Sequence, residues 1–119
     1  MTKVFLVGTA DCESDMLLAI YANKEKALVA YHENRLELLE QAKHSFEWSK
    51  ERAKKDLEEN KDYEGKPYSD DMITYLKDQA ENGDSMYLDM IKNLSEEDPD
   101  KMSNYPSDTP YLREEIVIE

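Results

Sequence analysis

Short apolar runs and long amphipathic segments follow one another along this chain, and each kind predicts a different element. Residues 3–9 (KVFLVGT) and 15–21 (DMLLAIY) are two apolar runs separated by a short polar stretch. Runs of this length are typical of strands, and their closeness predicts that they pair as a hairpin. A third run, in residues 111–119 with Ile116 and Ile118, predicts a strand near the other end of the sequence.

A long segment with helical periodicity follows Asn23, which is placed to cap it. Residues 24 to about 60 contain no glycine or proline, and their apolar side chains recur on one stripe at about 100° per residue. The stripe consists of Leu28, Tyr31, His32, Leu39, Ala42, Phe46, Ala53 and Leu57, with Leu36 at its margin. Such a helix would be roughly 55 Å long, so we expect part of it to project or to pair with another helix.

A second helix is predicted after the glycine- and proline-containing turn at residues 61–68. Ser69 is placed to cap it, and Asp70 and Asp71 lie at the positive end of its dipole. The apolar stripe of this helix stays in phase across Gly83 and comprises Met72, Leu76, Ala80, Gly83, Tyr87, Met90 and Leu94. This continuity predicts one helix, kinked or thinned at Gly83, in which Gly83→Ala is neutral or stabilising.

The order of these elements, β-β-α-α-β, predicts an α+β fold. Residues 95–110 are acidic and contain three prolines, so they are expected to form a surface loop. The simplest arrangement is a small three-stranded sheet, made of the hairpin and the C-terminal strand, packed against a long antiparallel helical hairpin. At 119 residues, residues 1–119 are expected to form a single domain.

Negative charge is concentrated in one half of the chain. Residues 1–60 hold 9 Lys/Arg and 12 Asp/Glu, a net of −3, whereas residues 61–119 hold 6 Lys/Arg and 16 Asp/Glu, a net of −10. The second half also holds six of the eight tyrosines. Acidic groups mixed with tyrosines are better suited to a basic protein surface than to chemistry on a small substrate. Direct binding to nucleic acid or to an anionic membrane is not expected, because both are polyanions.

Residues with catalytic or metal-binding chemistry are few and far apart. Cys12 lies between Asp11 and Glu13, a setting that opposes formation of a nucleophilic thiolate. His32 and His44 are roughly 18 Å apart along a helix, so they cannot share one metal ion, and His32 on the apolar stripe is expected to be a core residue. No phosphate-binding loop or Ser-His-Asp arrangement is visible. We expect no catalytic, cofactor-binding or metal-binding residue, and no enzyme.

The cellular compartment follows from what the sequence contains. One cysteine allows no internal disulfide, which favours a reducing cytoplasm. No apolar stretch is long enough for a signal peptide or a membrane span. We therefore expect a cytoplasmic protein.

Two groups of residues are candidates for partner binding. The first is the acidic side of the second helix with the loop after it: Asp70, Asp71, Asp78, Glu81, Asp89, Glu96, Glu97, Asp98, Asp100 and Tyr105. The second is Trp48, whose helical angle places it away from the apolar stripe, among charged residues. Each has an ordinary structural explanation. The acids are also suited to a solvated face that keeps the protein soluble, and Trp48 is also suited to burial under a neighbouring segment.

The opening of the chain resembles small accessory proteins encoded by bacteriophages and prophages. In that group a strand of the type KVYLV is followed by a Ser-Asp turn, a second strand and TKEKA at the start of a helix. Here residues 3–9 read KVFLVGT, Ser14 and Asp15 follow, and residues 22–27 read ANKEKA; residues 110–119 are similar to the group's closing strand. Most such proteins have no assigned activity, and some small acidic phage proteins inhibit host defence nucleases. The resemblance transfers no functional residue.

Charge and resemblance together predict a non-enzymatic, acidic phage or prophage protein that binds and modulates a host protein in the host cytoplasm. The expected target is a nucleic-acid-handling or defence enzyme whose basic groove the acidic face would occupy, as an inhibitor and possible nucleic-acid mimic. The alternative is a structural or assembly protein, for example a homodimer, that self-associates through its helical hairpin. An enzyme or small-ligand receptor is the third class.

Overall fold

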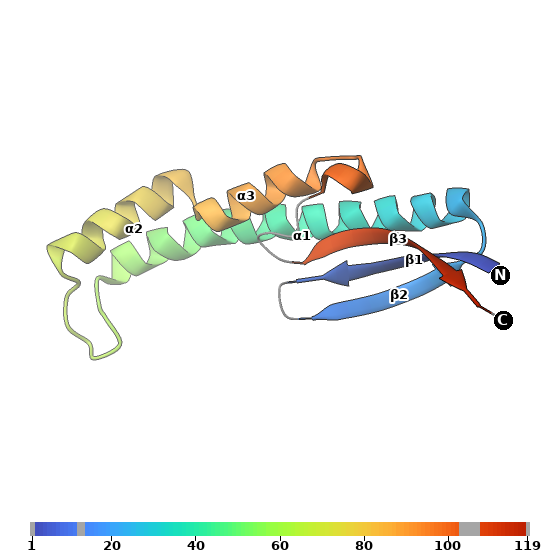
Figure 1. Cartoon of the computed structure of the whole chain (residues 1–119). Coiled ribbons are helices and arrows are strands. Elements are labelled where there is room, and N and C mark those ends of the chain that lie inside the picture. Colours follow the sequence, from blue (N-terminus) through green and yellow to red (C-terminus); the bar gives the residue numbers. More distant parts are fainter. Residues whose placement is uncertain (1, 12–13, 103–107, 119) are drawn as a thin grey trace. The chain divides into compact units, whose positions relative to one another are not determined.

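The computed structural model describes residues 2–11, 14–102 and 108–118. The elements follow in the order β1 (Thr2–Ala10), β2 (Asp15–Tyr21), α1 (Lys24–Glu59), α2 (Asp70–Asn82), α3 (Ser85–Leu94), the short 3₁₀ helix η1 (Pro99–Lys101) and β3 (Thr109–Val117) (Figure 1). The α+β class and the expected order of strands and helices are confirmed, except that the second helix is divided into α2 and α3.

The chain forms two compact units. Unit 1 consists of Met1–Gln41 and Asp89–Glu119, and unit 2 consists of Ala42–Leu88. Helices α1 and α3 therefore each contribute residues to both units.

The sheet of unit 1 has the strand order β2-β1-β3, with both neighbours antiparallel to the central strand. In the middle of the sheet Phe5 lies opposite Tyr21 on β2 and opposite Glu114 on β3. The register of β1 and β2 shifts between Val7 and Gly8, which is a β-bulge. The three-stranded sheet made of the hairpin and the C-terminal strand is thereby confirmed.

The core of unit 1 lies between one face of this sheet and the first part of α1 (Figure 1). Phe5 and Val7 on β1 are buried in one cluster with Ala27 and Tyr31 on α1. The helix begins as expected, because the Asn23 side chain accepts a hydrogen bond from the Lys26 N–H at 3.0 Å. Apolar burial on alternate β1 residues therefore defines the inner face of the sheet.

Arg35 joins α1 to the end of α3 inside unit 1. Its side chain is only 6% exposed, and its Nη1 donates a hydrogen bond of 2.8 Å to the carbonyl oxygen of Leu94, the last residue of α3. Its Nε donates to Nδ1 of half-buried His32 at 3.3 Å. His32 is thus a packed, hydrogen-bonded residue, as its stripe position predicts. A cation at the negative end of a helix is favourable, and it fixes where α3 ends.

In unit 2, α2 lies beside the second part of α1 (Figure 1). The Ser69 side chain accepts a hydrogen bond from the Met72 N–H at 3.2 Å, so the predicted cap of α2 is confirmed. Ala53 on α1 and Leu76 on α2 are buried. At the other end of α2 the Ser49 hydroxyl accepts a hydrogen bond from the Asp84 N–H at 3.1 Å.

The prediction that one helix continues through Gly83 is wrong. Gly83 has φ 75° and ψ 180°, and its N–H donates to the Gln79 carbonyl oxygen, so α2 ends at Asn82. This combination of angles is essentially restricted to glycine. A Cβ at Gly83 would also collide with the ring of Phe46 on α1. The apolar stripe stays in phase because α3 begins again at Ser85 and presents its own apolar side.

Gly83→Ala should therefore destabilise the protein, by about 2–4 kcal/mol, because it adds backbone strain and displaces the Phe46 ring. Urea unfolding followed by circular dichroism measures the loss. Gly65→Ala is the matched control, since Gly65 also has a positive φ (81°) but nothing lies within 4 Å of its Cβ position.

The difference in the free energy of unfolding between the two variants measures the contribution of the contact with Phe46. In a Phe46→Ala background the cost of Gly83→Ala should fall toward that of Gly65→Ala. A neutral or stabilising Gly83→Ala would contradict the break between α2 and α3.

Candidate functional site

The four predicted acids of α2 form an exposed acidic side of this helix. Asp70, Asp71, Asp78 and Glu81 are all exposed, and their helical angles place them opposite buried Leu76. Within the described residues none of the four forms an ion pair. The one side-chain contact among them is a hydrogen bond of 2.8 Å that Asp78 accepts from the Asn82 amide.

The acids on the facing part of α1 are arranged differently. Glu47 pairs with Lys50 at 3.9 Å, Glu51 with Lys54 at 3.5 Å, and Asp56 with Arg52 at 3.3 Å. Intrahelical pairs of this kind contribute only about 0.3–0.5 kcal/mol to stability, but they neutralise the acids locally. In unit 2, three of the five acids of α1 are therefore neutralised locally, whereas none of the four α2 acids has a basic partner within the described residues.

The remaining predicted acids lie in unit 1 and differ in their exposure. Asp89, Glu97 and Asp100 are exposed, whereas Glu96 and Asp98 are half-buried. Asp98 caps η1 by accepting a hydrogen bond of 3.0 Å from the Asp100 N–H.

Glu96 and Asp98 also act on the core. Burial is the main cause that raises the pKa of Tyr31 to about 12, and these two carboxylates raise it further. Tyr105 lies outside the described residues. Asp89 lies on α3 and is therefore not on the same helix as the four acids of α2.

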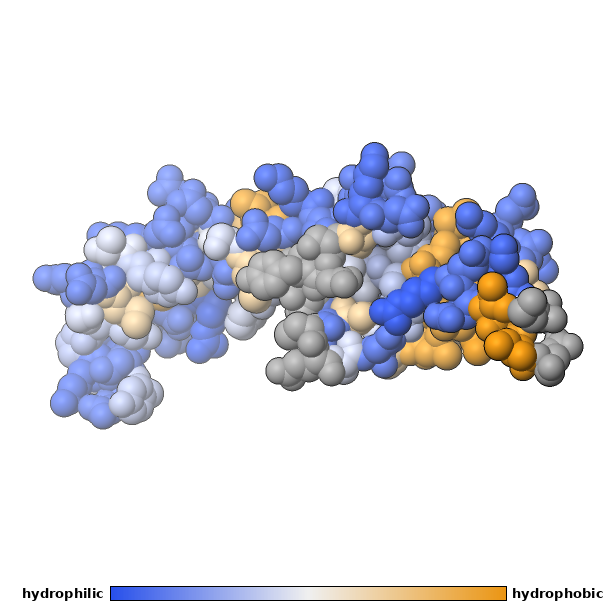
Figure 2. Space-filling view, in the orientation of Figure 1, coloured by the Kyte–Doolittle hydropathy of each residue, from blue (hydrophilic) through white to orange (hydrophobic). Residues whose placement is uncertain are grey.

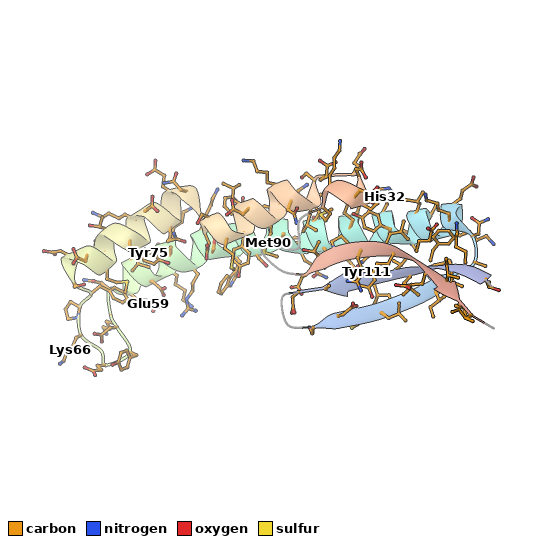
Figure 3. The ribbon with its side chains drawn as sticks, viewed as in Figure 1. His32, Glu59, Lys66, Tyr75, Met90 and Tyr111 are labelled. Carbon is orange, nitrogen blue, oxygen red and sulfur yellow. The ribbon has the colours of Figure 1, made fainter. Side chains whose placement is uncertain are left out.

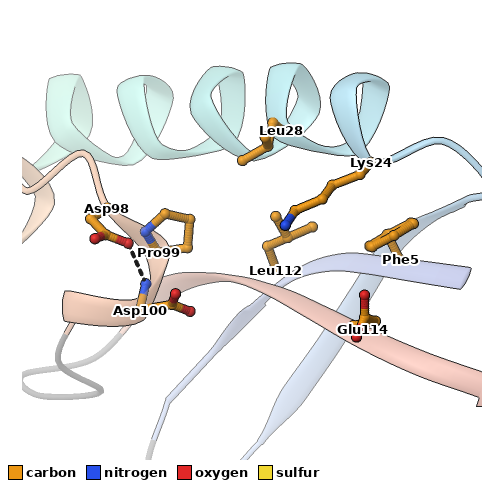
Figure 4. Close-up of a pocket in the computed structure, with 8 residues that line it drawn as sticks. All are labelled: Phe5, Lys24, Leu28, Asp98, Pro99, Asp100, Leu112 and Glu114. Atoms are coloured by element: carbon orange, nitrogen blue, oxygen red, sulfur yellow. Dashed lines mark hydrogen bonds between the residues drawn. The ribbon is translucent and has the colours of Figure 1, made fainter.

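An open cleft of about 400 Å³ lies in unit 1 between the start of α1, η1 and the sheet. Its lining combines apolar side chains with charged groups: Phe5, Lys24, Leu28, Asp98, Pro99, Asp100, Leu112 and Glu114 (Figure 4). Lys24 reaches into the cleft from α1, while Asp100 and Glu114 enter it from η1 and β3 (Figure 4). Three carboxylates and one ammonium on an apolar floor suit the side chain of a lysine or arginine.

Trp48 is exposed, so the alternative that it is buried under a neighbouring segment is wrong. It lines a shallow groove of about 150 Å³ in unit 2. Tyr75, which lines the same groove from α2, is labelled in Figure 3. The two side chains are 60% and 55% exposed. Arg52 and Asp56, which pair with each other at 3.3 Å, line the same groove. Two exposed aromatic residues beside a small apolar groove are typical of an interface anchor.

Sequence reasoning missed a polar cluster on the outer face of the sheet. Arg113 on β3 donates to the Asp15 carboxylate on β2 at 2.6 Å, and its guanidinium lies 4.1 Å from the centre of the Tyr111 ring. Tyr111 (Figure 3) passes over Gly8 on the central strand, where a Cβ would collide with its hydroxyl group. Only strand register brings these residues together.

The cluster changes the titration of two of its members. The hydrogen bond that Tyr111 donates to Asp15 is the main cause, with Arg113 second, that holds the pKa of Asp15 below its usual range. Burial, with the neighbouring Asp15 carboxylate second, raises the pKa of Tyr111 to about 12. Ionised Asp15 therefore stabilises the folded protein at pH values above the pKa that Asp15 has in the unfolded chain. This stabilisation is lost as the pH falls through the lower pKa that Asp15 has in the folded protein.

Tyr111→Phe should raise the pKa of Asp15, because the main hydrogen bond to its ionised form is removed. The variant should therefore be less stable than the unmodified protein near pH 7, and this difference should shrink as the pH falls through the pKa that Asp15 has in the unmodified folded protein. NMR titration of the Asp15 carboxyl carbon and unfolding measured from pH 7 to 2 test both points. Tyr63→Phe is the control, since Tyr63 is 95% exposed. An unchanged Asp15 pKa in Tyr111→Phe would show that the cluster does not form.

The described residues contain no group of three or more His, Cys, Asp or Glu arranged to hold a metal ion. None of the helices in the described ranges has an apolar stretch long enough to cross a bilayer. Cys12 lies outside the described residues. Comparisons of the chain with protein families, with curated proteins and with solved structures find no match.

Proposed function

We propose that this chain is a non-enzymatic protein that binds a basic surface of another protein. The observation that carries the proposal is the row of four exposed carboxylates on α2, none of which has a basic partner within the described residues, whereas three of the five acids of α1 in unit 2 are paired. Charges left unneutralised on one side of a helix produce a field that steers an oppositely charged partner. The net charge of −13 gives this field its sign.

The cleft of unit 1 supports the proposal with a specific contact. A lysine or arginine of the partner would lay its aliphatic part on Leu28 and Leu112 and bring its charge to Asp100 and to Glu114, which Lys3 already contacts at 3.5 Å. Lys24 reaches into the same space and forms no ion pair within the described residues. It would compete with the incoming cation.

The resemblance to phage and prophage accessory proteins supports a more specific version of the proposal. In that version the partner is a nucleic-acid-handling or defence enzyme of a bacterial host, and the protein inhibits it in the cytoplasm by occupying a groove that otherwise receives nucleic acid. A surface of carboxylates is suited to such a groove because it presents the same sign of charge as a phosphate backbone. In this proposal the protein itself binds neither nucleic acid nor a membrane.

Reversing the four α2 acids to lysine should weaken partner capture strongly and slow association, because the steering charge is inverted. The immobilised protein is incubated with bacterial lysate, and captured proteins are identified and then measured against each variant at low and high salt. Raising salt should reproduce the loss on the unmodified protein, since exposed charges are screened beyond about 8–10 Å at physiological ionic strength. The fold should survive, because the four side chains are exposed.

The matched control reverses four exposed acids of α1 that form no ion pair within the described residues: Glu33, Glu37, Glu58 and Glu59. The net charge changes equally, so only position differs. In the cleft, Lys24→Gln should strengthen capture and Asp100→Asn should weaken it. Equal effects of the two reversals, or partners that stay bound at high salt, would show that the acids serve solubility.

The exposed aromatic groove favours the alternative function, structural assembly through the helical hairpin. In that case Trp48→Ala should weaken self-association by about thirtyfold or more, because truncating an interface tryptophan typically costs about 2 kcal/mol or more. Analytical ultracentrifugation measures this, with Tyr63→Ala as the control for an exposed aromatic residue outside the groove. Unchanged self-association in Trp48→Ala would exclude the groove as the contact.

A further inference from the structure

The outer face of the sheet, the face turned away from α1, is apolar and exposed. Side chains directly opposite one another in a sheet share a face, so the register that turns Phe5 inward turns its neighbour Leu6 outward. The exposed apolar residues of this outer face are Leu17, Leu18, Ile20 and Val117, and Val4, Leu6 and Tyr111 are partly exposed on it. Figure 2 shows apolar side chains gathered over β2 and the end of β3.

The polar groups on this outer face largely satisfy one another. Arg113 pairs with Asp15 at 2.6 Å and lies against the Tyr111 ring, whose hydroxyl group donates to Asp15. Apart from this pair the face carries one charged strand residue, Glu115 opposite Val4. Its net charge is therefore about −1, on a chain whose net charge is −13.

We propose that the outer face of the sheet is where two copies of this chain associate, face to face. Two copies with a charge of −13 repel each other over most of their surfaces, and the outer face is a large apolar area with almost no net charge. A partner recognised by charge would use the acids of α2 and leave this face uncovered. A second copy is apolar and nearly neutral at the matching place, so the face is complementary to itself.

The size of the face agrees with a dimer. Three strands about 4.8 Å apart and about 30 Å long give a footprint of roughly 400 Å². Projecting side chains expose more surface than a flat footprint, so the face is of the same order as the roughly 800 Å² per partner of a standard interface.

The geometry also fixes which residues meet. Sheets that pack face to face lie about 10 Å apart with nearly aligned strands. A two-fold axis parallel to β1 would place β2 of one copy on β3 of its partner, so Ile20 would lie over the partner's Arg113 and Leu17 over the partner's Tyr111. Leu6, in the middle of the central strand, would lie near the axis. The contact therefore differs from assembly through Trp48.

Sedimentation equilibrium over a concentration series tests the proposal. The unmodified protein should approach twice the mass of one chain, 13.9 kDa. Ile20→Glu should raise the dimer dissociation constant about a hundredfold or more, because it buries an added charge in the contact and the partner's Arg113 is already bonded to Asp15. Ile20→Thr keeps the β-branched side chain and should weaken the dimer less, but in the same direction, and circular dichroism verifies that both variants fold.

Val29→Glu is the matched control, since Val29 is as exposed as Ile20 (60% against 59%) but lies on α1. It should leave the dimer unchanged. A protein that stays monomeric at all concentrations would overturn the proposal. Equal dissociation by Val29→Glu would do the same, as would dissociation by Trp48→Ala with none by Ile20→Glu or Ile20→Thr.

Discussion

The architecture of unit 1 depends on one buried cation. The chain leaves the sheet after β2, and its last strand must return beside β1. Arg35 fixes the point from which it returns, because its guanidinium is bonded to the carbonyl of Leu94. Burying a charge is costly unless it is hydrogen-bonded, and here the cost is offset by the Leu94 carbonyl oxygen and the His32 ring nitrogen. After Leu94 the chain continues to Asp98, which caps η1, and then to β3.

Much of the fold could be predicted because its signals are local. Asn23 and Ser69 both cap the helices that the sequence assigned to them, and the bounds of the hairpin and α1 depend on periodicity and on the absence of glycine and proline. The helix break at Gly83 could not be predicted, because the spacing of apolar residues is the same for one kinked helix and for two helices joined in phase. The deciding facts, a φ of 75° and the Phe46 ring against the glycine, are a backbone angle and a tertiary contact.

Some of the candidate sites could likewise be predicted from local sequence signals, and others could not. Acids on one side of α2 follow from helical angle, and so does the position of Trp48 outside the stripe. The cleft and the Tyr111 cluster do not, since they need strand register. Asp15 and Arg113 are 98 residues apart in the chain, and their contact depends on the bulge after Val7 and on the missing side chain at Gly8. The apolar residues of β2 predict a strand, but they do not show which face of the sheet is left exposed to solvent.

The central position of β1 has a consequence for synthesis on the ribosome. Its partner on one side, β2, emerges immediately afterwards, whereas the pairing of Thr2 with Val117 must wait for more than a hundred further residues. Until then one edge of β1 exposes unpaired backbone groups, and contacts so distant in sequence form slowly. The nascent chain is therefore most vulnerable to wrong pairing while its helices are complete and its sheet is not. Newly made chains should need protection in that interval, more than the finished molecule does.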